Sequence, residues 1–226
     1  MLIIAIDTSG RHGSVALCRG DKESCQTLQL APIEGGTYSA RLVPIISELL
    51  RQNGFAKHDI EGFTVVSGPG SFTGLRVGLA TVKGLCEVLQ KPLATVSMLE
   101  AIVVTYGRAG ETVTAALDAG RGEVYVGEYK VATGGASLVR EYIAPLETFA
   151  REARELAGIL LTPDAIVAQS FRLAGAQARL VTPLQADAIG RIGIRKLLAG
   201  ELADPVTVDV NYIRRSDAEI FSAPKS

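Results

Sequence analysis

The chain has few of the residues that several common classes of protein require. Its longest apolar runs, such as 2–6, hold about five residues, whereas a membrane-spanning helix needs roughly 20, so we expect no membrane segment. Only two histidines are present, His12 and His58, and neither stands in an HxxH-like or HExxH context. A histidine-based metal site and a metallopeptidase therefore lack their ligands. A Ser-His-Asp hydrolase is poorly supported, because the sequence has no G-x-S-x-G elbow for the nucleophile.

The chain also has no excess of charge of either sign. The 226 residues contain 23 Lys and Arg and 24 Asp and Glu, which gives a formal net charge of −1. No overall positive field then draws the protein onto nucleic acid, so any contact with RNA has to be local or shared with a partner.

Cysteine is scarce as well. Cys18, Cys25 and Cys86 are odd in number and have no CxxC spacing, which is typical of reduced, buried thiols. The chain runs from Met1 directly into apolar residues and reaches Asp7 without the basic segment or cleavage site of a secretory signal. We therefore expect a cytoplasmic protein.

What is present indicates a duplicated globular chain. Hydrophobic residues make up 47% of it, and the length allows one large domain or two small ones. The apolar run 2–6 ends in Asp7-Thr8-Ser9-Gly10 before a second strand-like run. About 110 residues later, 112–117 ends in Asp118-Ala119-Gly120 before another such run. A strand-Asp-Gly-strand unit is also ordinary hairpin chemistry, so coincidence is the alternative to duplication.

The periodicity of the apolar residues predicts the same order of elements in each half, namely three strands, a helix, a strand and a helix. This order predicts a mixed α/β class with two domains, 1–106 and 107–226. In the first half we expect strands at 2–6, 14–18, 24–30, 63–66 and 93–96 and helices at 39–52, 75–90 and 98–106. In the second half we expect strands at 112–117, 123–129, 137–143 and 165–168 and helices at 146–157 and 187–199.

A glycine-rich segment, 68–74, lies at a predicted strand-to-helix junction, where free amide groups favour an anion. Gly68, Gly70 and Ser71 could hold a phosphate there, although the segment matches neither a Walker loop nor GxGxxG. Gly70, Gly74 and Gly78 also recur every four residues, which leaves one helix face bare and lets a neighbouring backbone approach. We favour packing or partner contact as the role of these glycines.

The two aspartate turns offer a second candidate site. Asp7 could hold a hydrated metal while Thr8 and Ser9 contact phosphates, but Asp118 is followed by no hydroxyl. Turn formation through bonds from the carboxylate to the backbone is the interpretation that we favour for both aspartates. The competing hypothesis is a stand-alone ATP-dependent small-molecule kinase that uses Asp7, Thr8 and the loop 68–74.

Two surfaces invite a partner. The predicted helix at 39–52 has apolar residues on more than one face, so it needs a second neighbour, either in this chain or in another protein. Arg191, Arg195, Arg214 and Arg215 could touch RNA phosphates, although a solvated helix face is the simpler interpretation because acidic and basic residues balance in the second half.

Four motifs in order resemble the bacterial TsaB (YeaZ) family. They are IAIDTS at 4–9, SGPGSFTGLRVG at 67–78, DAGRGEVY at 118–125 and NYIR at 211–214, and the second is highly specific. The resemblance implies two tandem RNase H-like domains of the actin/hsp70/sugar-kinase type, with mixed sheets flanked by helices. The family often has histidine at the position of Tyr38.

The resemblance also implies a function. Members of this family are non-catalytic scaffold subunits, without cofactor or metal, in the complex that makes threonylcarbamoyladenosine in tRNA. It implies a TsaD-like catalytic partner, a TsaE-like ATPase in the larger complex, tRNA bound through the complex, and a possible homodimer. The expected partner interface comprises Leu42, Ile45, Ile46, Leu49, Gly74, Gly78, Val82 and Leu85. The expected vestigial phosphate loops comprise Asp7, Thr8, Ser9, Gly68, Gly70, Ser71 and Asp118.

Overall fold

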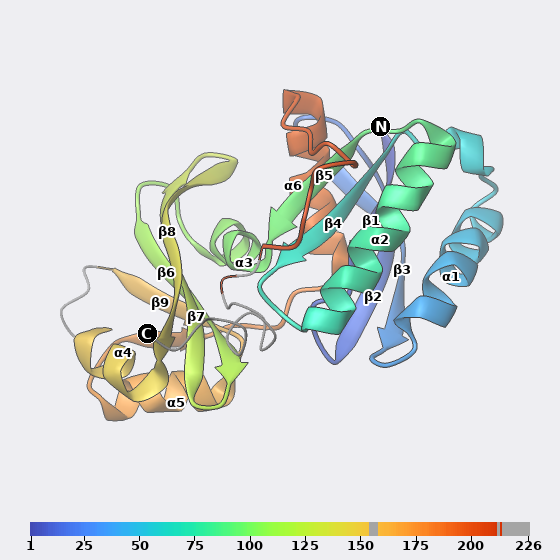
Figure 1. Ribbon diagram of the computed structural model, residues 1–226. Coiled ribbons are helices and arrows are strands. Elements are labelled where there is room, and N and C mark those ends of the chain that lie inside the picture. The colour runs from blue at the N-terminus through green and yellow to red at the C-terminus, as the bar shows by residue number, and fades with distance from the viewer. Residues whose placement is uncertain (154–157, 212, 214–226) are drawn as a thin grey trace. The chain divides into compact units, whose positions relative to one another are not determined.

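The computed structural model describes residues 1–153, 158–211 and 213, and the chain divides into two compact units. The first unit holds Met1–Ala101 and Pro183–Val210, and the second holds the described residues of Ile102–Thr182 together with Asn211. Each unit contains a five-stranded mixed sheet with helices against it (Figure 1). The helix α3 (Met98–Tyr106) spans the division between the units.

The sheet of the first unit has the order β3-β2-β1-β4-β5. Its first three strands are antiparallel neighbours, and β4 and β5 run parallel to β1. The strands are β1 (Leu2–Asp7), β2 (His12–Gly20), β3 (Cys25–Glu34), β4 (Gly62–Gly68) and β5 (Leu93–Ser97). The helices are α1 (Tyr38–Gln52), the short 3₁₀ helix η1 (Lys57–Asp59), α2 (Phe72–Leu89) and α6 (Ala186–Ala199).

Strand β1 is apolar at successive positions because both faces of its sheet are covered. Ile3 and Ala5 pack in one buried cluster with Ala186 and Ile194 of α6. Side chains alternate along a strand, so Ile4 and Ile6 face the other side, where α1 and α2 lie (Figure 1). Helices therefore cover both faces of the sheet, and the turn residues that follow β1 lie at one end of this central strand.

The helix α6 belongs to the first unit, which differs from the predicted division into 1–106 and 107–226. It contacts all five strands of the first sheet. Two glycines of α6 make this possible, because a Cβ at Gly190 would lie 2.6 Å from Cys18 Sγ and one at Gly193 would lie 2.4 Å from Thr64 Oγ1. The second half therefore supplies a layer of the first unit.

The second unit repeats the topology of the first. Its sheet has the order β10-β9-β6-β7-β8, with β7 antiparallel to β6 and β9 parallel to it. Phe149 and Phe171 meet edge to face in its core, with their ring centroids 5.2 Å apart. The elements are β6 (Thr112–Gly120), β7 (Glu123–Ala132), β8 (Gly135–Pro145), α4 (Leu146–Glu152), β9 (Ile159–Thr162), α5 (Ala165–Leu173) and β10 (Ala178–Leu180).

The matching strand orders confirm the predicted repeat, and most predicted elements fall where they were expected. The strand predicted at 165–168 was wrong, because these residues begin α5. The apolar run 165–168 is too short to show a period, and Val167, Ala168 and Phe171 face the core at helical spacing. The strand at this point of the repeat is β9, and part of the helix predicted at 146–157 lies outside the described residues.

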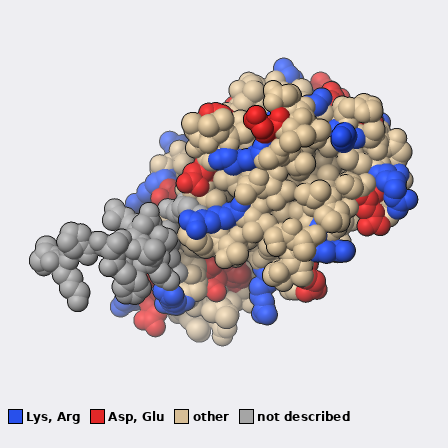
Figure 2. Space-filling model, turned by 45° about the vertical axis from the view of Figure 1, so that its right-hand side comes forward, with Lys and Arg blue, Asp and Glu red and all other residues tan. Residues whose placement is uncertain are grey.

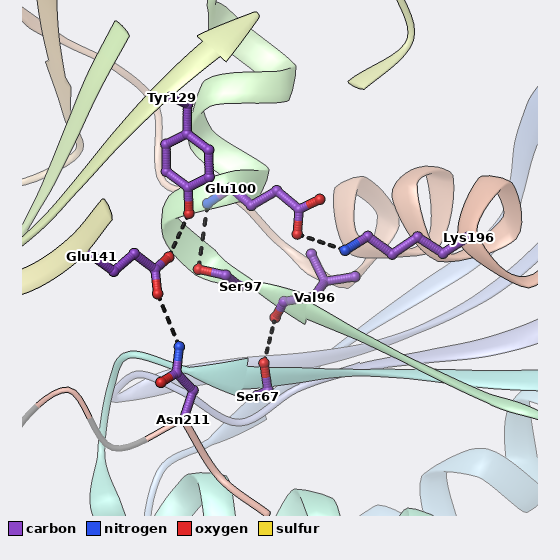
Figure 3. Close-up of polar contacts among 8 residues, drawn as sticks. All are labelled: Ser67, Val96, Ser97, Glu100, Tyr129, Glu141, Lys196 and Asn211. Carbon is purple, nitrogen blue, oxygen red and sulfur yellow. Dashed lines mark hydrogen bonds and ion pairs between the residues drawn. The ribbon is translucent and has the colours of Figure 1, made fainter. Parts of the chain in front are cut away.

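Several polar contacts join the elements within each unit (Figure 3). In the first unit, Lys196 Nζ on α6 lies 2.8 Å from Glu100 Oε2 on α3, and both side chains are largely buried. In the second unit, Tyr129 on β7 donates a hydrogen bond to Glu141 on β8, which also accepts one from Asn211 at 2.9 Å. Among the described helices, none is both long and apolar enough to cross a bilayer.

Candidate functional site

The turn after β1 holds its aspartate inside the protein. Asp7 is buried, and its Oδ1 accepts hydrogen bonds from the Ser9 backbone amide at 2.8 Å and from Ser9 Oγ at 2.6 Å. Burial raises the pKa of the Asp7 carboxyl above its ordinary value, while the two bonds from Ser9 oppose that rise. The carboxylate thus forms the local turn that its sequence context favours.

The start of α2 closes over this turn. Ser71 is the N-cap of α2 and accepts a hydrogen bond from the Gly74 amide at 3.3 Å. The Ser71 amide itself donates to the Ser9 carbonyl oxygen at 2.6 Å, and a Cβ at Gly70 would lie 2.4 Å from the same oxygen. The segment 68–71 is therefore folded onto the chain's own turn.

Thr8 lies directly against the glycine face of α2. A Cβ at Gly74 would be 2.1 Å from the Thr8 carbonyl oxygen, and one at Gly78 would be 2.2 Å from Thr8 Oγ1. Thr8 is fully buried, and its hydroxyl has no hydrogen-bond partner among the described residues. The neighbour that Gly74 and Gly78 admit within this chain is Thr8.

The second aspartate turn has the same local bond but is open. The Gly120 amide donates a hydrogen bond to Asp118 Oδ1, two residues earlier in the chain, at 2.8 Å. The Ser9 amide makes the same bond to Asp7. Asp118 is exposed, and its own amide donates to Asp164 Oδ2 at 2.8 Å. Burial raises the pKa of Asp164. Sequence reasoning missed Asp164, since only the pairing of β6 with β9 brings it to this turn.

The described residues around these turns do not form a group of metal ligands. Among residues 1–153, 158–211 and 213, no three or more His, Cys, Asp or Glu side chains are grouped so that they could hold an ion. Asp118 and Asp164 are two carboxylates without a third ligand, and Asp7 is engaged by Ser9. The described geometry offers packing and turn formation at both loops.

The helices α1 and α2 pack against each other and have inner and outer faces of different character. Most of the side chains expected at a partner interface are on the inner faces, within the core of the first unit. They form the stripe that each helix presents to its own sheet. The buried ones are Leu42, Ile45, Ile46, Leu49, Gly74, Gly78 and Val82, and Leu85 is half-buried.

The outer faces of the two helices carry exposed small and uncharged side chains, with the exposed charged residues Arg51, Arg76 and Glu87 among them. We call the uncharged set the α1–α2 face. It includes Val43, which is 49% exposed, and Val88, which is 77% exposed. Its members are Ala40, Val43, Pro44 and Ser47 on α1 and Thr73, Ala80, Gly84 and Val88 on α2.

Of the four arginines expected near RNA, two lie within the described residues and two do not. Arg191 and Arg195 lie one turn apart on α6, in the first unit, and Arg191 Nη1 is 3.2 Å from Asp187 Oδ2. Their charges also act on Cys25 of β3. Arg214 and Arg215 lie outside the described residues.

Comparison with known proteins gives consistent matches. Residues 35–182 match a family model described as "TsaD: tRNA N6-adenosine threonylcarbamoyltransferase". The tRNA threonylcarbamoyladenosine biosynthesis protein TsaB of Bacillus subtilis is 33% identical over 59% of this chain and 57% of its own length. The TsaB protein of Escherichia coli is 36% identical over 58% of this chain and 55% of its own. The match thus spans little more than half the length of these relatives.

Comparison with solved structures shows a fold similar to that of YeaZ proteins. A crystal structure of a Pseudomonas aeruginosa protein with similarity to peptidase YeaZ superposes with a TM-score of 0.74, covering 94% of this chain and 99% of that one, at 24% identity. The predicted fold class, α/β with two mixed sheets flanked by helices, is confirmed by this likeness and by the repeated strand order. The chain belongs to the TsaB (YeaZ) family, within the wider family that the TsaD model describes.

Proposed function

We propose that this protein is a scaffold subunit in the biosynthesis of threonylcarbamoyladenosine on tRNA. Its role in the proposal is to bind a TsaD-like catalytic subunit through the α1–α2 face. The names of its relatives support the pathway, and the match to the TsaD family model supports a partner of related fold. A TsaE-like ATPase and tRNA join through the complex, and a homodimer through the same face is its form without a partner.

The observation that carries the proposal is the character of the α1–α2 face. The exposed residues Ala40, Val43, Ala80, Gly84 and Val88 bear no charge, and their small volume lets another helix layer approach closely. Figure 2 turns this side of the first unit toward the viewer, and charged side chains of both signs surround a broad area of uncharged ones. Such an area is what an interface core needs, with its charges at the rim.

The closed turn at Thr8 supports a role without chemistry of its own. A kinase of the actin class would need the hydroxyl of Thr8 and the amides at the start of α2 free to meet a phosphate. In this structure Thr8 is buried against Gly78, and the Ser71 amide is bonded to Ser9. A phosphate could enter only if α2 moved off its own sheet.

Size-exclusion chromatography with the TsaD protein of the same organism tests the proposal. We expect the full chain to co-elute with TsaD, and Ala80→Glu to abolish co-elution because it places a charge within the α1–α2 face. The matched control is Ile166→Glu, which changes a side chain that is 70% exposed on α5, in the other unit, and should co-elute as the parent does.

Two results would overturn the proposal. One is a parent chain that fails to co-elute with TsaD, and the other is Ala80→Glu co-eluting as well as Ile166→Glu does. Calorimetry with Mg-ATP tests the alternative separately, since a kinase predicts measurable heat of binding to the isolated chain and the scaffold predicts little or none.

A further inference from the structure

The segment that follows α6 lies against the open edge of the first sheet. We call residues 201–210 the strap, which is drawn in red beside β5 in Figure 1. The Ala203 amide donates a hydrogen bond to the carbonyl oxygen of Leu93, the first residue of β5, at 2.8 Å. The strap ends at Val210, whose side chain is buried. Because β5 is an outermost strand, the strap covers part of an exposed edge.

A turn at Asp204 gives the strap a defined conformation. Asp204 Oδ1 accepts a hydrogen bond from the Val206 amide at 2.9 Å, and Oδ2 accepts one from Thr207 Oγ1 at 2.8 Å. The Asp204 carbonyl oxygen accepts a third, from the Val208 amide, at 2.9 Å. The bonds from Val206 and Thr207 hold the pKa of Asp204 below its ordinary value, and the charge of Lys83 adds to this.

The side chain of Lys83 joins this turn to α2. Lys83 Nζ donates hydrogen bonds to the carbonyl oxygens of Val208 at 2.9 Å and of Val206 at 3.3 Å. On α2, Lys83 stands three residues after Ala80 and directly before Gly84, and both of these belong to the α1–α2 face. Residues three apart are neighbours on a helix surface, so the strap is held beside that face.

The exposed large hydrophobic side chains of the first unit are confined to three segments. Among its described residues they are Val43 on α1, Phe72 and Val88 on α2, and Leu202 and Val206 on the strap. Leu202 is 55% exposed and Val206 is 78% exposed. Single apolar residues on a surface need no explanation, whereas a group on adjoining segments indicates an interaction surface.

We propose that the strap is a second part of the surface that binds the TsaD-like subunit, an inference that rests on the proposed function. Leu202 and Val206 contact apolar side chains of the partner, beside those that meet the α1–α2 face. Lys83 is a positioning residue, since it acts through the strap. Glu201 and Asp209 are exposed at the two ends of the strap, so the matching rim of the partner is basic.

Titration of the full chain with the TsaD protein of the same organism in a calorimeter tests this. Val206→Glu should raise the Kd by at least about 10-fold, because it places a charge in an apolar contact. The matched control is Leu173→Glu on α5, in the second unit, where the side chain is 79% exposed. This control should keep the parent Kd.

Two more variants test the other parts of the proposal. Lys83→Met should speed amide hydrogen exchange across 204–210 in the isolated chain and weaken binding, and Lys83→Arg, which keeps two donors, should restore both. Glu201→Gln with Asp209→Asn should make the Kd less dependent on salt. Parent-like exchange and affinity in Lys83→Met would contradict the positioning role, and an unchanged salt dependence would contradict the basic rim.

The outcomes separate this inference from the proposed function. A parent chain that does not bind TsaD rejects both. A parent that binds, with Ala80→Glu that does not and Val206→Glu as tight as Leu173→Glu, rejects the strap alone. If the strap instead pairs two copies of this chain, Val206→Glu changes the oligomeric state of the isolated chain and leaves the affinity for TsaD unchanged, which also overturns the inference. Far-UV circular dichroism confirms that each variant is folded.

Discussion

Substituting alanine for two glycines of the same helix should have opposite effects on stability. Gly78 and Gly84 both lie within α2, where alanine is favoured over glycine by about 1 kcal/mol on intrinsic propensity. Gly84 is exposed with nothing within 4 Å of a new Cβ, so Gly84→Ala should stabilise the protein by about 0.5–1 kcal/mol. Only the surroundings of the glycine differ between the two positions.

At Gly78 a new Cβ would be 2.2 Å from Thr8 Oγ1 and 3.4 Å from Thr8 Cβ. Thr8 cannot move outward because it is fully buried beneath the start of α2. Overpacking of a tight core contact costs about 1–3 kcal/mol. After the gain in helix propensity of about 1 kcal/mol is subtracted, Gly78→Ala should destabilise the first unit by up to about 2 kcal/mol.

The assay is urea denaturation followed by far-UV circular dichroism, because the chain has no tryptophan to report by fluorescence. The double variant Thr8→Ala with Gly78→Ala should recover most of the loss, since it removes the hydroxyl that the new methyl meets. Equal stabilisation by Gly78→Ala and Gly84→Ala would refute the close contact, as would strictly additive effects of Thr8→Ala and Gly78→Ala.

Three further predictions use the same assay. Burial raises the folded-state pKa of Asp7 above its unfolded value, so Asp7 lowers the free energy of unfolding as the pH rises through that folded-state pKa. Asp7→Asn should shrink this loss of stability. Identical urea midpoints of Asp7→Asn and the parent from about pH 4 to 8 would argue against the raised pKa. Tyr38→Phe removes the bond from the Tyr38 hydroxyl to the Gly10 carbonyl at 2.7 Å and should cost about 1 kcal/mol, and no measurable loss would mean that water replaces it. Lys196→Met leaves Glu100 largely buried without its partner, and a loss of about 1.5–3 kcal/mol is expected, with a double-mutant cycle against Glu100→Gln measuring the coupling.

The repeat could be predicted from the sequence because it depends on local patterns. A β-rich run, an aspartate, a glycine turn and a second run occur twice, and each aspartate makes the same bond to the amide two residues on. Periodicity also places α3 and most strands correctly. It failed at 165–168, where four apolar residues fit a strand and a helix equally.

Long-range packing could not be predicted. The spacing of Gly74 and Gly78 predicts that another segment packs closely against this face of α2, but it does not identify Thr8 as that neighbour. Nothing local to α6 shows that it covers the first sheet, because its apolar stripe would suit either sheet. The contact of Asp164 with the Asp118 turn likewise depends on strand pairing, which a single sequence does not show.

The place of α6 has a consequence for how the chain is made. The ribosome synthesises β1 to β5 before α6. The sheet face formed by Ile3, Ala5 and Ala94 therefore cannot be covered until Ile194 and Leu197 of α6 have been made. Until about 80 further residues have emerged, that face must stay open, be held by a chaperone, or be covered by a temporary neighbour. The second unit, Ile102–Thr182, has its own core and can fold during this interval. The half that begins first is therefore the one that finishes last.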